Sequence, residues 1–241
     1  MKIRSYKQDA DAIVYDADRV HQPDPELFDP EHWLGQGTVV GQAVGRGRAL
    51  LLETGFGPAV LRQYLRGGWP AKFSRDRYLF TGFGNSRPHA EFAMLARLTE
   101  MKLPVPAPLA ALCRRQGLFY RGWLLMERLL NVQVLADLLG DPSRDRALWQ
   151  TVGATVARFH RAGVVHPDLN VRNILVGPDD AVHLIDFDRA RLVENNAAAC
   201  RANLRRLRRS VEKLWPAAEV DRLPDCWADF QNGYYDGMEP A

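Results

Sequence analysis

One short stretch in the second half of the chain combines side chains that can handle a proton and a divalent cation. Residues 166–188 contain His166, Asp168, Asn173 and Asp186. An aspartate carboxylate can orient a hydroxyl group and accept its proton. Amide and carboxylate oxygens are hard ligands that suit Mg²⁺ beside phosphate oxygens. The stretch therefore predicts phosphoryl transfer to a hydroxyl, with Asp168 as the catalytic carboxylate and with Asn173 and Asp186 as metal ligands.

The spacing of these residues brings them together. Asn173 follows Asp168 by five residues, so one loop can present both side chains to the same site. The apolar runs 173–176 and 183–187 are typical of two short strands, and the Gly-Pro-Asp-Asp segment 177–180 predicts the turn between them. Such a hairpin returns Asp186 to the side of Asn173.

The pattern HxDLxxxN at 166–173, followed by Ile-Asp-Phe at 185–187, resembles the catalytic loop and metal-binding triplet of the protein-kinase-like superfamily. The resemblance implies an ATP- and Mg²⁺-dependent kinase in which His166 braces the loop. It also implies an α+β, two-lobed fold with a small β-rich N-lobe and a reduced, mainly helical C-lobe. Asp188 stands where protein kinases have the glycine of this triplet, and no Ala-Pro-Glu motif follows it, which disfavours a protein substrate.

The order of the expected elements agrees with two lobes. We expect an irregular, proline-containing leader at 1–36, an N-lobe at 37–129 that grips the nucleotide phosphates, and a C-lobe at 130–241 with the catalytic loop, the metal site and the acceptor site. Glycine-punctuated and apolar runs predict strands at 38–44, 48–53, 59–65, 109–115 and 119–129. Helical spacing of apolar residues predicts helices at 89–102, 147–163 and 201–215, before an aromatic, acidic tail.

Five residues of the expected N-lobe are candidates for ATP binding. Gly45 and Gly47 lie between the first two strands, where backbone N–H groups can approach phosphate, although a plain glycine turn explains them nearly as well. Arg62 takes the place of the lysine that the superfamily has on its third strand, and Glu91 on the following helix is its expected partner. The backbone near Glu127 is expected to meet adenine.

The composition indicates in which cellular compartment the protein is expected and which classes of protein are disfavoured. The 241 residues carry a net charge of +3, and no apolar run is long enough to span a bilayer. The N-terminal residues lack the apolar core of a signal peptide. Three widely spaced cysteines without a CxxC pattern disfavour disulfides and zinc, so a reducing compartment is expected. These features predict a cytoplasmic protein that is at most peripheral to a membrane.

Two basic stretches bear on the acceptor. Residues 62–87 interleave arginines and lysine with aromatic side chains, a mixture that suits an anionic sugar or a membrane surface. Residues 201–215 predict a basic amphipathic helix, which is either a membrane-surface helix or a core helix with a solvated basic side. No recognised nucleic-acid motif accompanies the charge, and no obligate protein partner is evident.

Several segments together make the resemblance more specific: the chain is similar to bacterial lipopolysaccharide kinases that act on 3-deoxy-D-manno-octulosonic acid (Kdo). The segments that carry it are VLRQYLRGG (60–68), DRYLFTG (76–82), Arg87 with Glu91 and Phe92, Pro104-Val105-Pro106, HPDLNVRNILV (166–176) and LIDFDRAR (184–191).

This resemblance implies phosphorylation of a Kdo hydroxyl, the 4-OH in the family, on a Kdo–lipid A precursor at the cytoplasmic face of the bacterial inner membrane. Arg189 and Arg191 are candidates for contact with the acceptor's carboxylate or lipid phosphate. The alternatives are a heptose kinase, an aminoglycoside- or choline-type phosphotransferase, a protein kinase and a catalytically silent scaffold. The intact trio of Asp168, Asn173 and Asp186 argues against the last.

Overall fold

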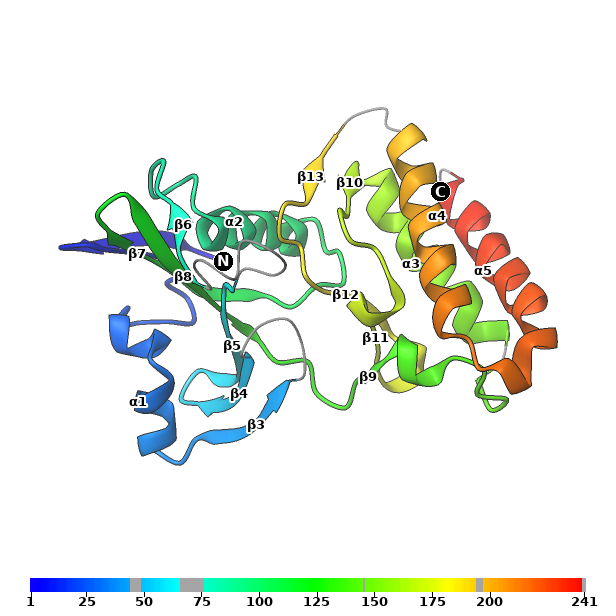
Figure 1. Cartoon of the computed structure of the whole chain (residues 1–241), viewed down its shortest axis with the longest axis horizontal. Coiled ribbons are helices and arrows are strands. Elements are labelled where there is room, and N and C mark those ends of the chain that lie inside the picture. The colour runs from blue at the N-terminus through cyan, green and yellow to red at the C-terminus, as the bar shows by residue number, and fades with distance from the viewer. Residues whose placement is uncertain (44–48, 66–75, 145, 194–196, 240–241) are drawn as a thin grey trace. The chain divides into compact units, whose positions relative to one another are not determined.

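The chain divides into a sheet-rich unit and a mainly helical unit. The computed structural model describes residues 1–43, 49–65, 76–144, 146–193 and 197–239. The first unit comprises Met1–Glu100 and Pro106–Leu129, and the second comprises Met101–Val105 and Leu130–Ala241. Strands dominate the first and helices the second, which confirms the α+β class (Figure 1).

A single antiparallel sheet forms the body of the first unit. Its strands run in the order β1-β2-β7-β8-β5-β4-β3, and the short β6 pairs with β8. The strands are β1 Ile3–Gln8, β2 Asp11–Asp16, β3 Val39–Ala43, β4 Ala49–Thr54, β5 Gly57–Gln63, β6 Tyr78–Leu79, β7 Pro108–Gln116 and β8 Phe119–Glu127. The strands expected at 38–44, 48–53 and 59–65 correspond to β3, β4 and β5, which pair antiparallel in this order. Those expected at 109–115 and 119–129 correspond to β7 and β8, which also pair antiparallel.

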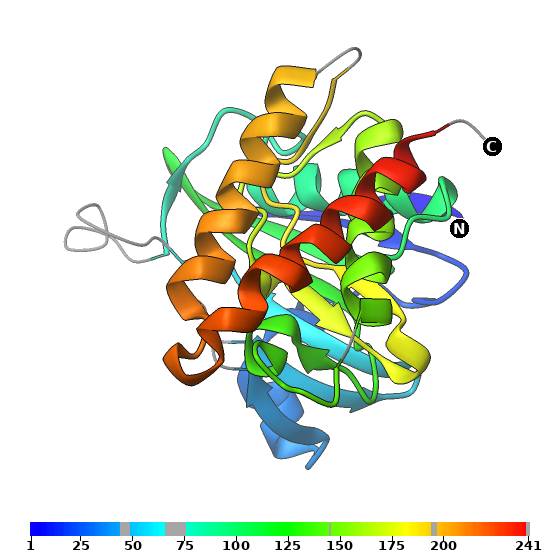
Figure 2. The ribbon, with the colours of Figure 1, turned by 90° about the vertical axis from the view of Figure 1, so that its right-hand side faces the viewer.

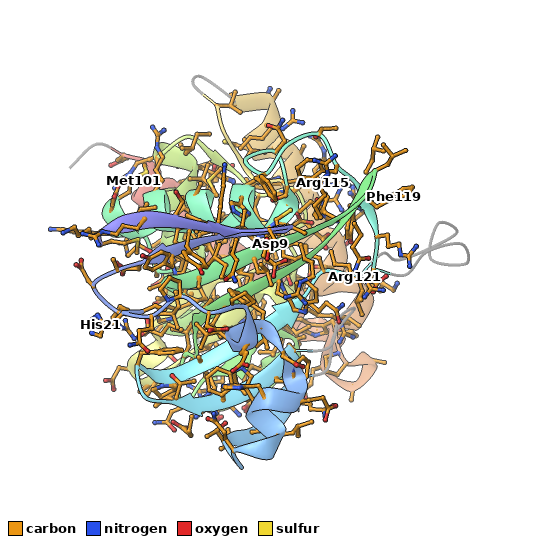
Figure 3. The ribbon with its side chains drawn as sticks, turned by 90° about the vertical axis from the view of Figure 1, so that its left-hand side faces the viewer. Asp9, His21, Met101, Arg115, Phe119 and Arg121 are labelled. Carbon is orange, nitrogen blue, oxygen red and sulfur yellow. The ribbon has the colours of Figure 1, made fainter. Side chains whose placement is uncertain are left out.

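The expected irregular leader is wrong for most of its length. Residues 3–8 and 11–16 form the hairpin β1-β2, whose second strand pairs with β7 from Asp11↔Arg114 to Tyr15↔Ala110. Figure 3 shows Asp9 at the turn of this hairpin and Arg115 and Phe119 near the turn between β7 and β8. The short apolar run Ala12-Ile13-Val14-Tyr15 is a strand signal that the surrounding charges and prolines obscured.

Both faces of the central strands are covered. The residues 108–113 of β7 are all buried, which requires packing on each side of the sheet. Helix α2 (Arg87–Glu100) packs against β7 and buries Phe92 and Leu95. Trp33 of the short helix α1 (Pro30–Gly35) belongs to the apolar core that includes β4, β5 and β7, and its indole N–H donates to the Leu27 carbonyl at 2.9 Å.

The second unit contains short strands and a group of helices. Its strands are β9 Gln133–Val134, β10 Val164–Val165, β11 Ile174–Val176, β12 Val182–Leu184 and β13 Arg191–Leu192. Its α-helices are α3 Arg146–Arg161, α4 Ala197–Leu214 and α5 Leu223–Met238. Short 3₁₀ turns lie at Pro25–Phe28 in the first unit and at Leu135–Leu138, Val171–Asn173, Pro178–Asp180 and Ala217–Arg222 in the second.

The acidic, aromatic tail forms a helix that packs closely against α3. A Cβ on Gly153 of α3 would lie 2.1 Å from the Phe230 carbonyl oxygen, and a Cβ on Gly233 of α5 would lie 2.1 Å from the Gln150 carbonyl oxygen. Glycine on each helix therefore lets the two backbones approach each other. Figure 2 shows α5 in red beside α4 in orange. The helix buries Trp227, Phe230 and Tyr234.

Candidate active site

The loop between β10 and β11 carries the predicted catalytic residue, and His166 shapes it. The Asp168 backbone N–H donates to His166 Nδ1 at 3.2 Å, and His166 Nε2 lies 2.9 Å from the Ile185 carbonyl oxygen. One nitrogen accepts and the other donates, so a neutral imidazole satisfies both contacts. Burial lowers the pKa of His166, which favours that neutral form. His166 braces the loop, as expected from the sequence.

Asn173 is tied to the backbone of Asp168. The Asn173 side-chain Nδ2 donates to the Asp168 carbonyl at 2.9 Å, and the Asn173 N–H donates to the Asn170 carbonyl at 3.0 Å. Asn170 closes the same loop, because its Nδ2 donates to the Asp168 carbonyl at 2.8 Å. The amide nitrogen of Asn173 thus faces the loop, and its Oδ1 oxygen is the atom that can bind a cation.

The predicted hairpin brings Asp186 next to Asn173. Strands β11 and β12 pair from Ile174↔Leu184 to Val176↔Val182, and the Ile185 N–H donates to the Asn173 carbonyl at 3.0 Å. Asp186 follows directly, with a positive φ of 65° that is uncommon for aspartate and recurs at functional sites. Positive φ occurs at Asp186 and Arg189 but not at Asp188, so the backbone has no need of glycine at position 188.

The oxygen donors of this loop suit a magnesium ion bound to phosphate. One amide oxygen and one carboxylate are hard ligands, and Mg²⁺ usually takes one or two carboxylates together with substrate phosphates and water. Among the residues that the structure describes, no group of three or more His, Cys, Asp or Glu side chains could hold a metal ion by itself. The donor set therefore fits a metal that is shared with a nucleotide.

Helix α4 holds the catalytic loop in place, a role that sequence reasoning missed. Asn203 Oδ1 accepts from the His166 N–H at 3.1 Å, and Asn203 Nδ2 donates to the His166 carbonyl at 2.8 Å. Ser210 Oγ accepts from the Val171 N–H at 3.1 Å. Arg206 Nη1 lies 3.4 Å from Asp168 Oδ1. The spacing 203, 206, 210 places all three on one face of the helix.

The same helix was expected to be basic and amphipathic, and it is. Leu207 and Val211 are buried in the second unit, whereas Leu204 and Leu214 are only partly buried. The buried face also contains Asn203, and a polar residue within an apolar stripe is the signal that predicts a buried hydrogen bond. Leu207 and Val211 of the apolar face are thus covered by the protein itself, whereas Arg201, Arg205, Arg206 and Arg209 are exposed.

Arg62 and Glu91 form the predicted ion pair in the first unit. The Arg62 guanidinium of β5 donates to the Glu91 carboxylate of α2, whose side chain is 1 % exposed. Tyr64, which directly follows the end of β5, also donates its hydroxyl to Glu91. Burial and the neighbouring Glu91 charge raise the pKa of Tyr64 well above its usual value. Tyr64 is a residue of the first unit that sequence reasoning missed, although it lies only two positions after Arg62 in the sequence.

Of the remaining candidates for nucleotide binding, the structure describes only Glu127. Gly45 and Gly47 lie outside the described residues. Glu127 ends β8 and is half-buried, and its N–H donates to the Ala107 carbonyl at 2.8 Å. That amide is already engaged, so a nucleobase would have to use other backbone groups of residues 127–129.

The first basic stretch is described at 62–65 and 76–87 only. Within these residues the Arg87 guanidinium lies 5.0 Å from the centre of the Tyr78 ring and 5.5 Å from that of Tyr64. Its Nη1 donates to the Tyr78 hydroxyl at 3.1 Å. Tyr64 and Tyr78 therefore both contact the Arg87 guanidinium.

The chain matches a family of known kinases. The family described as "Lipopolysaccharide kinase (Kdo/WaaP) family" matches residues 30–234. The chain belongs to this family, and it is therefore a kinase, a phosphotransferase that acts on an alcohol group. Among the helices that the structure describes, none is long and apolar enough to cross a membrane.

Named relatives are similar over most of their length. A "3-deoxy-D-manno-octulosonic acid kinase" of Xanthomonas oryzae pv. oryzae is 49% identical over 203 residues, which are 84% of this chain and 81% of the relative. A protein of the same name from Stenotrophomonas maltophilia is 44% identical over 224 residues, 92% of this chain and 89% of the relative. The resemblance found in the sequence is thereby confirmed.

Proposed function

We propose that this kinase transfers the γ-phosphoryl group of ATP to a hydroxyl of Kdo on a Kdo–lipid A precursor, at the 4-OH by family resemblance. The relatives' names support the sugar. The observation that carries the chemistry is the local geometry of the loop: Asn173 bonds to the Asp168 backbone, and Ile185, which precedes Asp186, bonds to the Asn173 backbone. These contacts support a shared site for the three predicted side chains.

Each residue of the loop would have a separate role in catalysis. Asp168 orients the acceptor hydroxyl and takes its proton as the hydroxyl oxygen bonds to the γ-phosphorus and the bond from that phosphorus to ADP breaks, so that ADP leaves. Asn173 and Asp186 hold Mg²⁺, which neutralises charge on the phosphate oxygens when bound. The neutral His166 keeps the loop in shape and takes no proton in this scheme. Arg206 places a positive charge 3.4 Å from Asp168 Oδ1.

In the first unit, we propose that the Arg62–Glu91 pair positions the nucleotide phosphates. Glu91 is buried and receives both Arg62 and Tyr64, so the guanidinium is held in one orientation. A fixed, always charged guanidinium suits phosphate oxygens. Residues 37–129 and 130–241 would then be the N-lobe and the C-lobe of a two-lobed, protein-kinase-like fold, with adenine near Glu127.

Phosphate transfer from labelled ATP to a Kdo–lipid A precursor tests the reaction. We expect Mg²⁺-dependent transfer by the wild type and a fall in kcat of about 10²–10⁴-fold for Asp168→Asn. A heptose-bearing acceptor and free Kdo are tested in parallel. Transfer to heptose with none to Kdo would reject the proposed acceptor, and an undiminished rate for Asp168→Asn would reject the proposed base.

We also propose that the protein works at the anionic cytoplasmic surface of the inner membrane as a peripheral enzyme. The exposed arginines of α4 support this, because basic side chains near anionic lipid each contribute about 1 kcal/mol. Co-sedimentation with vesicles of anionic lipid, falling steeply as salt rises, is the expected result. Equal sedimentation with neutral vesicles would contradict it.

A further inference from the structure

A hollow in the second unit lies directly beside the catalytic loop. Its volume is about 360 Å³. One wall is formed by residues of β10 and the loop, and the other is formed by α4. The lining residues are Val165, Pro167, Ala199, Ala202, Asn203, Arg205, Arg206 and Arg209. Three of them are arginines and none is acidic, so the hollow is strongly positive.

Two of the three arginines, Arg205 and Arg209, differ from Arg208 on the same helix. Arg208 has an ordinary structural role, because it pairs with Glu212 at 2.7 Å and stacks on Trp227 at 4.9 Å. Among the residues that the structure describes, Arg205 and Arg209 have no acidic partner, and both side chains are exposed. They lie one helical turn apart and line the same hollow. Guanidinium groups in this arrangement can grip one carboxylate or phosphate group together.

Arg206 contacts both the hollow and Asp168, the proposed catalytic carboxylate. It lines the hollow and its Nη1 lies 3.4 Å from Asp168 Oδ1. An anionic acceptor brought next to the Asp168 carboxylate would be repelled unless positive charge lies between the two. Arg206 occupies that position, and Arg205 and Arg209 lie beyond it. The exposed Arg189 and Arg191, which the sequence suggested for this role, do not line the hollow.

We propose that this hollow binds the carboxylate of the acceptor sugar through Arg205 and Arg209 and so selects an acidic sugar over a neutral one. The assignment rests on the proposed function, because Kdo is a sugar acid. A carboxylate of the reacting sugar is favoured over a lipid phosphate, since the hollow adjoins the residue that orients the reacting hydroxyl. Arg206 acts as a positioning residue between the bound anion and Asp168.

The test compares two acceptors and three variants. The acceptors are the Kdo–lipid A precursor and its Kdo methyl ester, which lacks the negative charge. The variants are Arg205→Gln, Arg209→Gln and the matched control Arg201→Gln, an exposed arginine of the same helix that does not line the hollow. We expect the first two to raise the KM for the acid about tenfold, since a charged hydrogen bond contributes about that factor. The control and the KM for ATP stay unchanged.

The methyl ester provides the decisive comparison. With the wild type, its KM should be at least about tenfold above that of the acid, and Arg205→Gln and Arg209→Gln should cause no further increase. An equal loss on acid and ester would overturn the proposal. So would a loss that disappears when the lipid phosphates are removed from the acid, because the arginines would then bind the lipid. Thermal melting checks that each variant is folded.

Failure of the proposed function can be distinguished from failure of the proposed carboxylate site. If the wild type phosphorylates no Kdo acceptor, calorimetric titration with free Kdo and with its methyl ester still tests the hollow. A preference for the acid that is lost in Arg205→Gln but kept in Arg201→Gln supports the site. Equal binding of acid and ester overturns it.

Discussion

The side-chain amide of Asn203 bonds to both backbone polar groups of His166. Asn203 Oδ1 accepts from the His166 N–H at 3.1 Å, and Nδ2 donates to the His166 carbonyl at 2.8 Å. Asn203 also lies 3.4 Å from His160 Nε2, and His160 Nδ1 lies 2.9 Å from the Tyr234 hydroxyl. All four residues are buried. A polar chain thus runs from α5 through α3 and α4 to the catalytic loop.

We predict that Asn203→Leu lowers both stability and kcat. Leucine has a similar size but leaves the His166 N–H and carbonyl buried without partners, which costs about 1–3 kcal/mol for each unsatisfied group. Urea unfolding measures the first effect and steady-state kinetics the second. Asn203→Asp is the matched comparison, because it still accepts from the His166 N–H but cannot donate to the carbonyl. Full activity in Asn203→Leu would show that the loop holds its shape unaided.

Removal of the Glu91 charge should weaken nucleotide binding more than acceptor binding. In Glu91→Gln the Arg62 guanidinium loses its charged partner and is no longer fixed. We expect the KM for ATP to rise about tenfold or more while the KM for the acceptor changes little. Tyr64→Phe removes only the second donor to Glu91 and should have a smaller effect in the same direction. A change confined to the acceptor KM would contradict this role.

Replacement of Asp186, the proposed metal carboxylate, should alter the response to Mg²⁺. Asp186→Asn keeps the shape of the side chain but removes the charge that would hold the cation. We expect the Mg²⁺ concentration for half-maximal rate to rise at least about tenfold, with a lower maximal rate. Asp188→Asn, two residues further on, is the comparison. Equal Mg²⁺ dependence in wild type and Asp186→Asn would exclude Asp186 as a ligand.

The close packing of α3 and α5 predicts a strong effect of one methyl group. In Gly233→Ala the new Cβ would lie 2.1 Å from the Gln150 carbonyl oxygen, so the helices must separate. We expect a loss of at least about 1–3 kcal/mol in the free energy of unfolding, the usual cost of overpacking. Gly84→Ala is the control, since its Cβ would meet nothing within 4 Å. Equal melting temperatures for the two variants would refute the close contact.

Buried histidines predict a stability that falls on acidification. Burial lowers the pKa of His160 and of His166, and burial together with Lys7 lowers the pKa of His89 from 6.5 to about 4. Below about pH 6.5 the unfolded chain binds protons at these histidines that the folded chain does not, so protonation favours unfolding. The stability present above pH 6.5 is therefore lost as the pH falls toward these lower pKa values.

Urea unfolding at pH 7.5 and pH 5 measures this loss. His89 alone should account for about 1–2 kcal/mol of it. His89→Gln, which cannot gain a proton, should flatten the pH dependence by that amount even if it is less stable at pH 7.5. A pH dependence unchanged in His89→Gln would contradict the lowered pKa.

Local patterns were enough to predict most elements but not all of their partners. Glycine-punctuated apolar runs predicted the strands β3, β4, β5, β7 and β8 and the β11-β12 hairpin, and helical spacing predicted α2, α3 and α4, because each of these signals lies within one short segment of the chain. The hairpin β1-β2 was missed because charged residues and later prolines surround two short apolar runs. Helix α5 was missed because its glycines and acidic residues disfavour a helix locally, and close contact with α3 compensates.

The sequence by itself identified the lipopolysaccharide kinase family through the family segments. The types and spacing of Asp168, Asn173 and Asp186 predicted where its chemistry would lie. Only the tertiary structure showed that Tyr64 contacts Glu91. It also showed that three residues of α4 contact the loop of Asp168: Asn203, Arg206 and Ser210. The physical reason is the separation in sequence between the residues that make contact. Spacing reports contacts within one turn or one hairpin, whereas Asn203 reaches His166 across 37 positions of sequence through the packing of a helix that sequence alone could equally place on a membrane.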